Sequence, residues 1–354
     1  MVGRTDLVTG ESLWSTPIFL SGYLLTDSWV GPVAQLLSVL ANTFMYMPYV
    51  TREEQHRHKA FKQQFAQSVS FLSAPESMSE PYLDRPDHHG EIARRLFNEF
   101  QNDLGTPSVY LAYQPVHDKE HYFVYVEALL RWTHAEYGDI PPTAILNIVE
   151  DSDFIHTMGE WVIHQASRDI TAWKLAGHGT VKVAINISPT QLDSDSLPHV
   201  VEDVLKRHSL DASNLGLEIT ESRALPHSQT AEKTLRKLQQ MGMSLSMDDF
   251  GMGYTSLLYM QRFNLFAIKL DGSLTRDIPH NPLNQDIIRT ITRLGRSRDV
   301  KIVAEYVEDR DQRELLIELG CDLFQGYLYS PAMRSNELLK YLARSKDMMH
   351  IDRN

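Results

Sequence analysis

Acidic and amide side chains recur at the ends of short β-branched runs in the last two thirds of this sequence. Glu127 ends the run YFVYVE, Asn186 ends VKVAIN and Glu305 ends KIVAE. The other members of the set are Glu218 and Glu221 in GLEITE, Asp248 and Asp249 in SLSMDD, Asp271 in AIKLD and Gln325 in LFQGY, and the basic Lys269 lies beside them in AIKLD. Carboxylate and amide oxygens are hard ligands, which suit Mg²⁺ or Mn²⁺ better than zinc.

Gathered in one cleft, these carboxylates would repel one another, and divalent cations would relieve the repulsion. Asp248 and Asp249 are adjacent in sequence and could bridge two ions. Two ions about 3.5–4 Å apart serve phosphodiester hydrolysis by activating a water and stabilising the attacking and leaving oxygens. Lys269 would orient that water or neutralise phosphate charge. Each motif alone also fits a loop, a turn or a salt bridge, but their coincidence at strand ends indicates metal-dependent phosphate chemistry.

The elements that must position these residues alternate along the chain. Strands are predicted at residues 110–116, 122–128, 181–187, 215–220, 244–248, 266–270, 301–304 and 323–326. Helices are predicted at residues 154–176, 197–208, 230–240, 285–298 and 309–319. This alternation favours an α/β fold with a parallel sheet, and its size matches a (β/α)8 TIM-type barrel. The carboxyl ends of parallel barrel strands open on one face, so the strand-end residues are expected to converge there.

The same motifs resemble the EAL domain. Glu127–Ala128–Leu129 lies within EALLRW, and the motif YQP precedes it at residues 113–115. NIS, EITES, DDFGMG, IKLD, AEYVE and QGYLYSPAM then follow in the family's order, so the resemblance runs from about residue 109 to 340. It implies a phosphodiesterase that hydrolyses cyclic di-GMP to linear pGpG with two divalent cations, Mg²⁺ or Mn²⁺, and that forms a homodimer.

The resemblance also implies a role for each matching position. The implied metal ligands are Glu127, Asn186, Glu218, Asp248, Asp249 and Glu305. The implied catalytic residues are Lys269 near the catalytic water, Glu305, and Glu221, which anchors the loop after the Asp–Asp pair. The implied substrate contacts are Gln114, Leu129, Arg131, Asp271 and Gln325. Arg131 is expected on a phosphate, because a guanidinium group binds phosphate oxygens bidentately.

Two positions depart from the family pattern. Met252 stands in DDFGMG where a small residue is usual, and Tyr306 replaces the glycine of AEGVE. If that glycine provides an unusual backbone angle or a close approach, Tyr306 would crowd the site. Neither change removes a ligand, so we expect activity, at a normal or reduced rate.

The N-terminal segment is different in composition. Asp27 is the one charged residue between Ser12 and Thr51, and residues 29–50 are long enough to cross the ~30 Å hydrocarbon core of a membrane. A buried helix of a soluble subdomain is the alternative. Basic residues from Arg52 onward favour a cytoplasmic location for the chain beyond this segment. The segment resembles the end of a phosphotransferase-system enzyme IIC permease, and it is too short for transport.

We therefore expect a membrane-like remnant at residues 1–50, a charged helix and linker at 51–107, the EAL domain at 108–345, and a tail at 346–354. An amphipathic helix at residues 91–104 is expected to pack on the domain after it. Membrane association is assigned to residues 12–50, with the catalytic domain in the cytoplasm. The net charge of −12 argues against a nucleic-acid polymer as partner.

Two other functions fit the motifs. The first is a non-catalytic receptor that binds cyclic di-GMP and signals through the linker. The second is a membrane-tethered interaction protein that uses the barrel as a scaffold. Loss of metal ligands would favour the receptor, and none of the ligand positions is lost, so the sequence favours the enzyme.

Overall fold

The computed structural model describes residues 72, 82–85, 87–220, 228–250 and 260–351, all of which belong to one compact unit spanning residues 62–354. The membrane-like remnant with its permease resemblance lies outside these residues, as does most of the linker. Glu221 and Met252 also lie outside them. Within the described residues, no helix combines the length and apolar character needed to cross a membrane.

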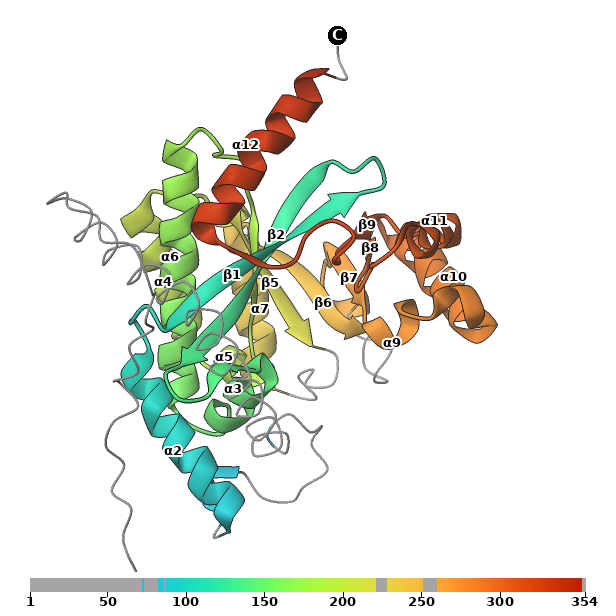
Figure 1. Ribbon diagram of the computed structural model, residues 1–354. Helices are drawn as coiled ribbons and strands as arrows, with labels where there is room; N and C mark the ends of the chain where they lie inside the picture. Colours follow the sequence, from blue (N-terminus) through green and yellow to red (C-terminus); the bar gives the residue numbers. More distant parts are fainter. Residues whose placement is uncertain (1–71, 73–81, 86, 221–227, 251–259, 352–354) are drawn as a thin grey trace, which may run out of the picture. The chain divides into compact units, whose positions relative to one another are not determined.

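Eight strands close into a barrel at the centre of the described unit (Figure 1). They are β1 (Val109–Asp118), β2 (Phe123–His134), β4 (Val183–Asn186), β5 (Leu215–Thr220), β6 (Ser244–Phe250), β7 (Ala267–Leu270), β8 (Lys301–Ala304) and β9 (Leu323–Phe324). The pairing of β1 with both β9 and β2 closes the ring. Two short strands, β3 (Gly138–Ile140) and β10 (Met333–Arg334), pair with β2 and β1. The predicted eight-stranded TIM-type barrel is confirmed.

The direction of the first strand differs from the prediction. β1 runs antiparallel to both of its barrel neighbours, β2 and β9, whereas the remaining barrel pairs are parallel. A parallel pair needs a crossover of a dozen or more residues, and only residues 119–122 connect β1 to β2, so the two strands form a hairpin. The wholly parallel barrel is therefore wrong for β1. The hairpin register places Gln114 directly opposite Glu127.

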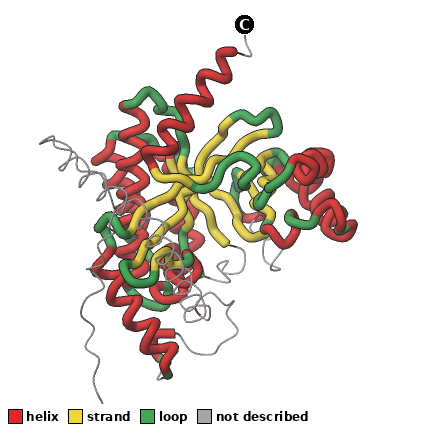
Figure 2. The backbone as a smooth tube through the Cα atoms, in the orientation of Figure 1, coloured by secondary structure: helices red, strands yellow, loops and turns green. Residues whose placement is uncertain are grey.

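Helices surround the strands (Figure 2). Five match the predicted positions: α4 (Phe154–Leu175), α6 (Leu197–His208), α7 (Gln229–Met241), α10 (Pro282–Arg298) and α11 (Arg310–Leu319). The sequence analysis did not predict α3 (Pro142–Val149), the short helices α5 (Pro189–Leu192) and α9 (Gly272–Thr275), or α12 (Ser335–Ile351). Short 3₁₀ turns occur at Tyr82–Asp84, Ala212–Asn214 and Ile278–His280.

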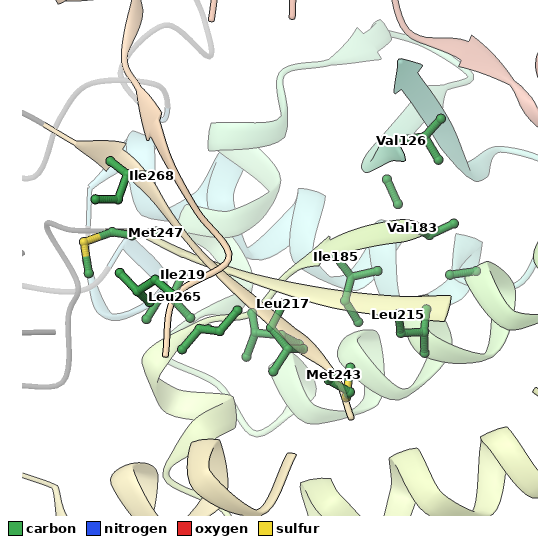
Figure 3. Close-up of a cluster of buried hydrophobic side chains, with 14 of the residues drawn as sticks. Val126, Val183, Ile185, Leu215, Leu217, Ile219, Met243, Met247, Leu265 and Ile268 are labelled. Carbon is green, nitrogen blue, oxygen red and sulfur yellow. The ribbon is translucent and has the colours of Figure 1, made fainter. Parts of the chain in front are cut away.

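The outer face of the barrel strands forms the main core with these helices. Val126, Ile185 and Ile268 are fully buried there on β2, β4 and β7 (Figure 3). Successive side chains of a strand point to opposite faces, so these outward residues alternate with residues that fill the barrel interior. Burial of apolar surface on the outer face therefore also fixes which side chains point inward.

A second core lies beside the β1–β2 hairpin. The helix α2 (His88–Asp103) packs Leu96 and Phe100 against Trp132 of β2, and all three side chains are buried. The indole Nε1 of Trp132 donates a hydrogen bond to Asp103 at 2.8 Å. The amphipathic helix predicted at residues 91–104 is thus present, and its packing on the domain after it is confirmed.

We expect the docking of α2 to contribute substantially to stability. Phe100 is fully buried, with its ring 5.1 Å from that of Trp132, so Phe100→Ala should lower the free energy of unfolding by about 3–5 kcal/mol. Urea unfolding of the full chain measures this. Leu175→Ala, at a position that is 85% exposed, is the matched control and should change stability by less than about 0.5 kcal/mol. Equal effects of the two substitutions would contradict the packing described.

Candidate active site

The barrel interior is built in layers. An apolar layer is formed by Val116, Tyr125, Ala184, Ala267, Val303 and Leu323. Two residues further toward the face where the parallel strands end lie Gln114, Glu127, Asn186 and Lys269 on the strands, and Glu305 and Gln325 directly after β8 and β9, with β1 read backwards because it is antiparallel. Because strand side chains alternate with a period of two, residues two apart share the interior. The apolar layer is therefore the floor of a polar site.

Lys269 lies at the centre of this polar layer. Its side chain is fully buried, and its Nζ contacts Glu127 Oε2 at 3.0 Å and Glu218 Oε2 at 2.8 Å. The same Nζ lies 3.3 Å from Asp248 Oδ1 and 2.9 Å from Glu305 Oε1. Five different barrel strands thus meet at one ammonium group. Removal of Lys269 would leave four mutually repelling carboxylates.

Amide side chains hold the Glu127 carboxylate in place. Asn186 donates from Nδ2 to Glu127 Oε1 at 2.9 Å, and Gln325 donates from Nε2 to Glu127 Oε2 at 2.8 Å. Gln114 Oε1 lies 3.3 Å from the Gln325 Nε2 and its own Nε2 donates to the Ser330 carbonyl at 3.2 Å. The hairpin register and the closing strand therefore fix the orientation of Glu127, because each oxygen has an assigned donor.

The backbone of β6 changes conformation between its two adjacent aspartates. Asp249 has a positive φ of 55°, and its backbone N–H donates to Asp248 Oδ1 at 3.0 Å. Pairing with β7 is irregular between Met247 and Phe250, which is where this turn of the backbone occurs. Asp248 is buried and Asp249 is half-buried. The irregularity lets both carboxylates reach the same end of the barrel, although consecutive strand residues normally point to opposite faces.

Two groups of carboxylates have the geometry of metal sites. Ligand oxygens of Glu127, Glu218 and Asp248 lie within 4.8 Å of one another, as do those of Asp248, Asp249 and Glu305. Asp248 belongs to both groups and would join them. Glu218 Oε1 is buried and has no hydrogen-bond partner among the described residues. An unpartnered buried carboxylate oxygen and five carboxylates near one ammonium fit the hard oxygen donor set of a divalent cation.

The pKa values report the same excess of negative charge. Burial, together with the carboxylates of Asp248 and Glu127, raises the pKa of Glu305 to about 8 despite the nearby Lys269. Burial and the adjacent Asp248 raise the pKa of Asp249 to about 6. Burial would also raise the pKa of Glu127, but Lys269 and the two amide donors outweigh it and lower that pKa. Burial also raises the pKa of Glu218 well above its usual value and raises that of Asp248, so four of the five carboxylates have raised pKa values.

Three other predicted residues, Leu129, Arg131 and Asp271, lie on β2 and directly after β7. Leu129 and Arg131 come after Glu127 at alternate positions of β2 and are half-buried, and Arg131 donates to the Leu130 carbonyl at 2.9 Å. Asp271 caps α9 by accepting a hydrogen bond from Ser273 N at 2.8 Å. Glu221 lies outside the described residues.

The sequence analysis missed Tyr125, whose hydroxyl is buried in the floor layer without a described partner. Its position two residues before Glu127 is the signal that could have found it.

The family comparison agrees with this geometry. The EAL domain model matches residues 97–332, which is well over half of the chain. The chain belongs to the EAL domain family. The matched region contains the whole barrel, every member of the carboxylate cluster and Lys269.

Similar EAL proteins come from several bacteria. The chain is 37% identical over 250 residues to a Pseudomonas aeruginosa protein named bifunctional diguanylate cyclase/cyclic di-GMP phosphodiesterase MucR, covering 70% of this chain and 36% of MucR. It is 35% identical over 249 residues to the cyclic di-GMP phosphodiesterase NbdA of the same organism, covering 70% and 32%. The chain thus spans about a third of the length of these relatives. The structure of the PaMucR phosphodiesterase in complex with c-di-GMP is 37% identical, with a TM-score of 0.65, over 69% of this chain and 99% of that one.

We expect Lys269→Met to lower the melting temperature in a pH-dependent way. Without the ammonium, repulsion among the four carboxylates destabilises the fold most when they are ionised. The decrease in melting temperature should therefore be larger at pH 8.5 than at pH 5.5, where protonation relieves the repulsion. Thermal unfolding of the metal-free full chain at the two pH values measures this. Lys206→Met, which breaks an exposed pair with Glu202, is the control and should change little. A loss that is the same at both pH values would contradict the electrostatic role of Lys269.

Proposed function

We propose that this EAL domain is a metal-dependent phosphodiesterase that hydrolyses cyclic di-GMP to linear pGpG. The observation that carries the proposal is the intact cluster of five carboxylates around Lys269 at the open end of the barrel. Relatives named as cyclic di-GMP phosphodiesterases and the c-di-GMP complex of the PaMucR phosphodiesterase support the choice of substrate. Membrane association through residues 12–50, a cytoplasmic catalytic domain and a homodimer stay proposals from the sequence.

The proposed metal ligands are the carboxylates of the two groups together with one amide, namely Glu127, Asn186, Glu218, Asp248, Asp249 and Glu305. Two Mg²⁺ or Mn²⁺ ions bound there would supply an activated water and stabilise charge on the phosphate oxygens. The chain's own contribution is to hold these ligands before the ions arrive. Lys269 keeps the carboxylates together, and the amide donors fix the orientation of Glu127, so little reorganisation is needed on binding.

Lys269 also has a role toward the substrate. Burial lowers its pKa, but Asp248, Glu127 and the other two carboxylates outweigh this and hold the pKa well above its usual value. A protonated ammonium can donate hydrogen bonds but cannot accept a proton. In the proposed reaction Lys269 therefore orients the attacking water or neutralises a phosphate oxygen, rather than acting as the base.

The substrate is expected to extend from this cluster along β2. Leu129 and Arg131 lie two and four residues beyond Glu127 on that strand, so they approach the same face of the barrel. Arg131 can bind a phosphate through its guanidinium group. Gln114 and Gln325 are already ordered beside Glu127 and could contact a bound phosphodiester without rearrangement of the strands.

The direct test is turnover of cyclic di-GMP by the full chain with Mg²⁺, with chromatography of the products. The expected product is linear pGpG, and Glu127→Gln should lower kcat by about 100-fold or more, because it removes a charged ligand that contacts Lys269. Glu202→Gln, on the exposed face of α6, is the control and should leave turnover unchanged. Tight binding of cyclic di-GMP without pGpG would instead identify a receptor and refute the enzymatic proposal.

A further inference from the structure

Tyr306 occupies a backbone conformation that favours glycine. It comes directly after Glu305 beyond the end of β8, on the face where the carboxylates converge, and its φ is +53°. A bulky residue in this left-handed region is strained by roughly 1–2 kcal/mol. Tyr306 stands where the motif AEGVE has glycine, and a glycine in this backbone conformation would be free of strain. Such strain persists where the surroundings hold the backbone in place.

Hydrogen bonds hold the backbone of Tyr306 on both sides. The Thr275 hydroxyl donates to the Glu305 carbonyl at 2.6 Å, and the buried Gln312 donates from Nε2 to the Tyr306 carbonyl at 3.0 Å. The next residue, Val307, donates its N–H to the Gln325 carbonyl at 3.1 Å. The position of the Tyr306 Cα is thus tied to the cluster through Glu305 and Gln325.

Two residues of the segment after β7 position the ring. The Arg276 guanidinium lies 4.1 Å from the ring centroid. A Cβ atom added at Gly272 would come within 2.5 Å of the ring, so the absence of a side chain there leaves room for it. Tyr306 nonetheless remains 43% exposed.

We propose that Tyr306, held by Arg276, is a platform on which one guanine base of the cyclic dinucleotide stacks. This rests on the proposed function and extends it to a substrate-binding side chain that the family glycine cannot supply. Arg276 lies over one face of the ring, so a base would stack on the other face, and every nucleobase offers a flat surface for such stacking. Because the backbone is fixed, stacking costs little ordering entropy. Tyr306 follows Glu305 and is not among the proposed metal ligands, so the proposal assigns its ring to binding and not to the chemical step.

The test compares three variants of the full chain in steady-state hydrolysis of cyclic di-GMP and in calorimetric binding without a divalent cation. Tyr306→Asn removes the ring but tolerates the left-handed backbone, and it should raise KM and Kd by about 5- to 100-fold with kcat within about twofold. Tyr306→Phe keeps the ring and should stay within about threefold of the unmodified chain. Tyr122→Asn, at an exposed tyrosine in the β1–β2 turn away from the site, should change nothing.

The outcomes separate the two proposals. If the unmodified chain produces pGpG and Tyr306→Asn leaves KM and Kd unchanged, the platform is refuted while the enzymatic function stands. Equal losses in Tyr306→Asn and Tyr306→Phe, or a loss in kcat alone, also refute it. If the unmodified chain neither binds nor hydrolyses cyclic di-GMP, the proposed function fails, and the platform for this ligand fails with it.

Discussion

The contact of one buried ammonium group with carboxylates from four other strands is the interaction on which the site depends. Lys269 reaches Glu127, Glu218, Asp248 and Glu305 at distances between 2.8 and 3.3 Å. Taking these charges out of water is costly, and the mutual attraction offsets that cost only because the geometry is close and hydrogen bonds complete it. Even so, the carboxylates outnumber the lysine, and burial, together with Asp248 and Glu127, raises the pKa of Glu305 to about 8. A site of this kind has the oxygen ligands that a divalent cation could use.

The closed barrel brings Lys269 and these carboxylates together. Outward apolar residues of each strand pack against the helices, and the alternation of side chains then sends every second residue inward. Strands from distant parts of the sequence thereby contribute to one layer. The hairpin of β1 and β2 adds Gln114 opposite Glu127, and the backbone turn at Asp249 brings a second aspartate to the same end. At the rim, the same rigidity supports Tyr306 in a conformation that an isolated peptide would avoid.

Much of the fold and of the candidate site could be predicted from the sequence, because the signals are local. Runs of β-branched residues located the barrel strands, and the acidic or amide residues at the ends of most of these runs located the site. The parallel direction predicted for β1 was wrong, because hydrophobic periodicity carries no information on strand direction. The short connection before β2 was the available clue. The contacts of Lys269 and the stacking of Arg276 on Tyr306 were also not predictable, because they join residues that only the closed barrel brings together. The positive φ of Tyr306 could only be suspected, through comparison with a glycine.

The central claim is that the cluster around Lys269 binds two divalent cations that act on a phosphodiester. Anomalous diffraction from crystals of the chain grown with Mn²⁺ tests it most directly. The account predicts two peaks about 3.5–4 Å apart, joined by Asp248, with one near Glu127 and Glu218 and the other near Asp249 and Glu305. Crystals at saturating Mn²⁺ that show no peak among these carboxylates, with Lys269 still in contact with all four, would contradict it.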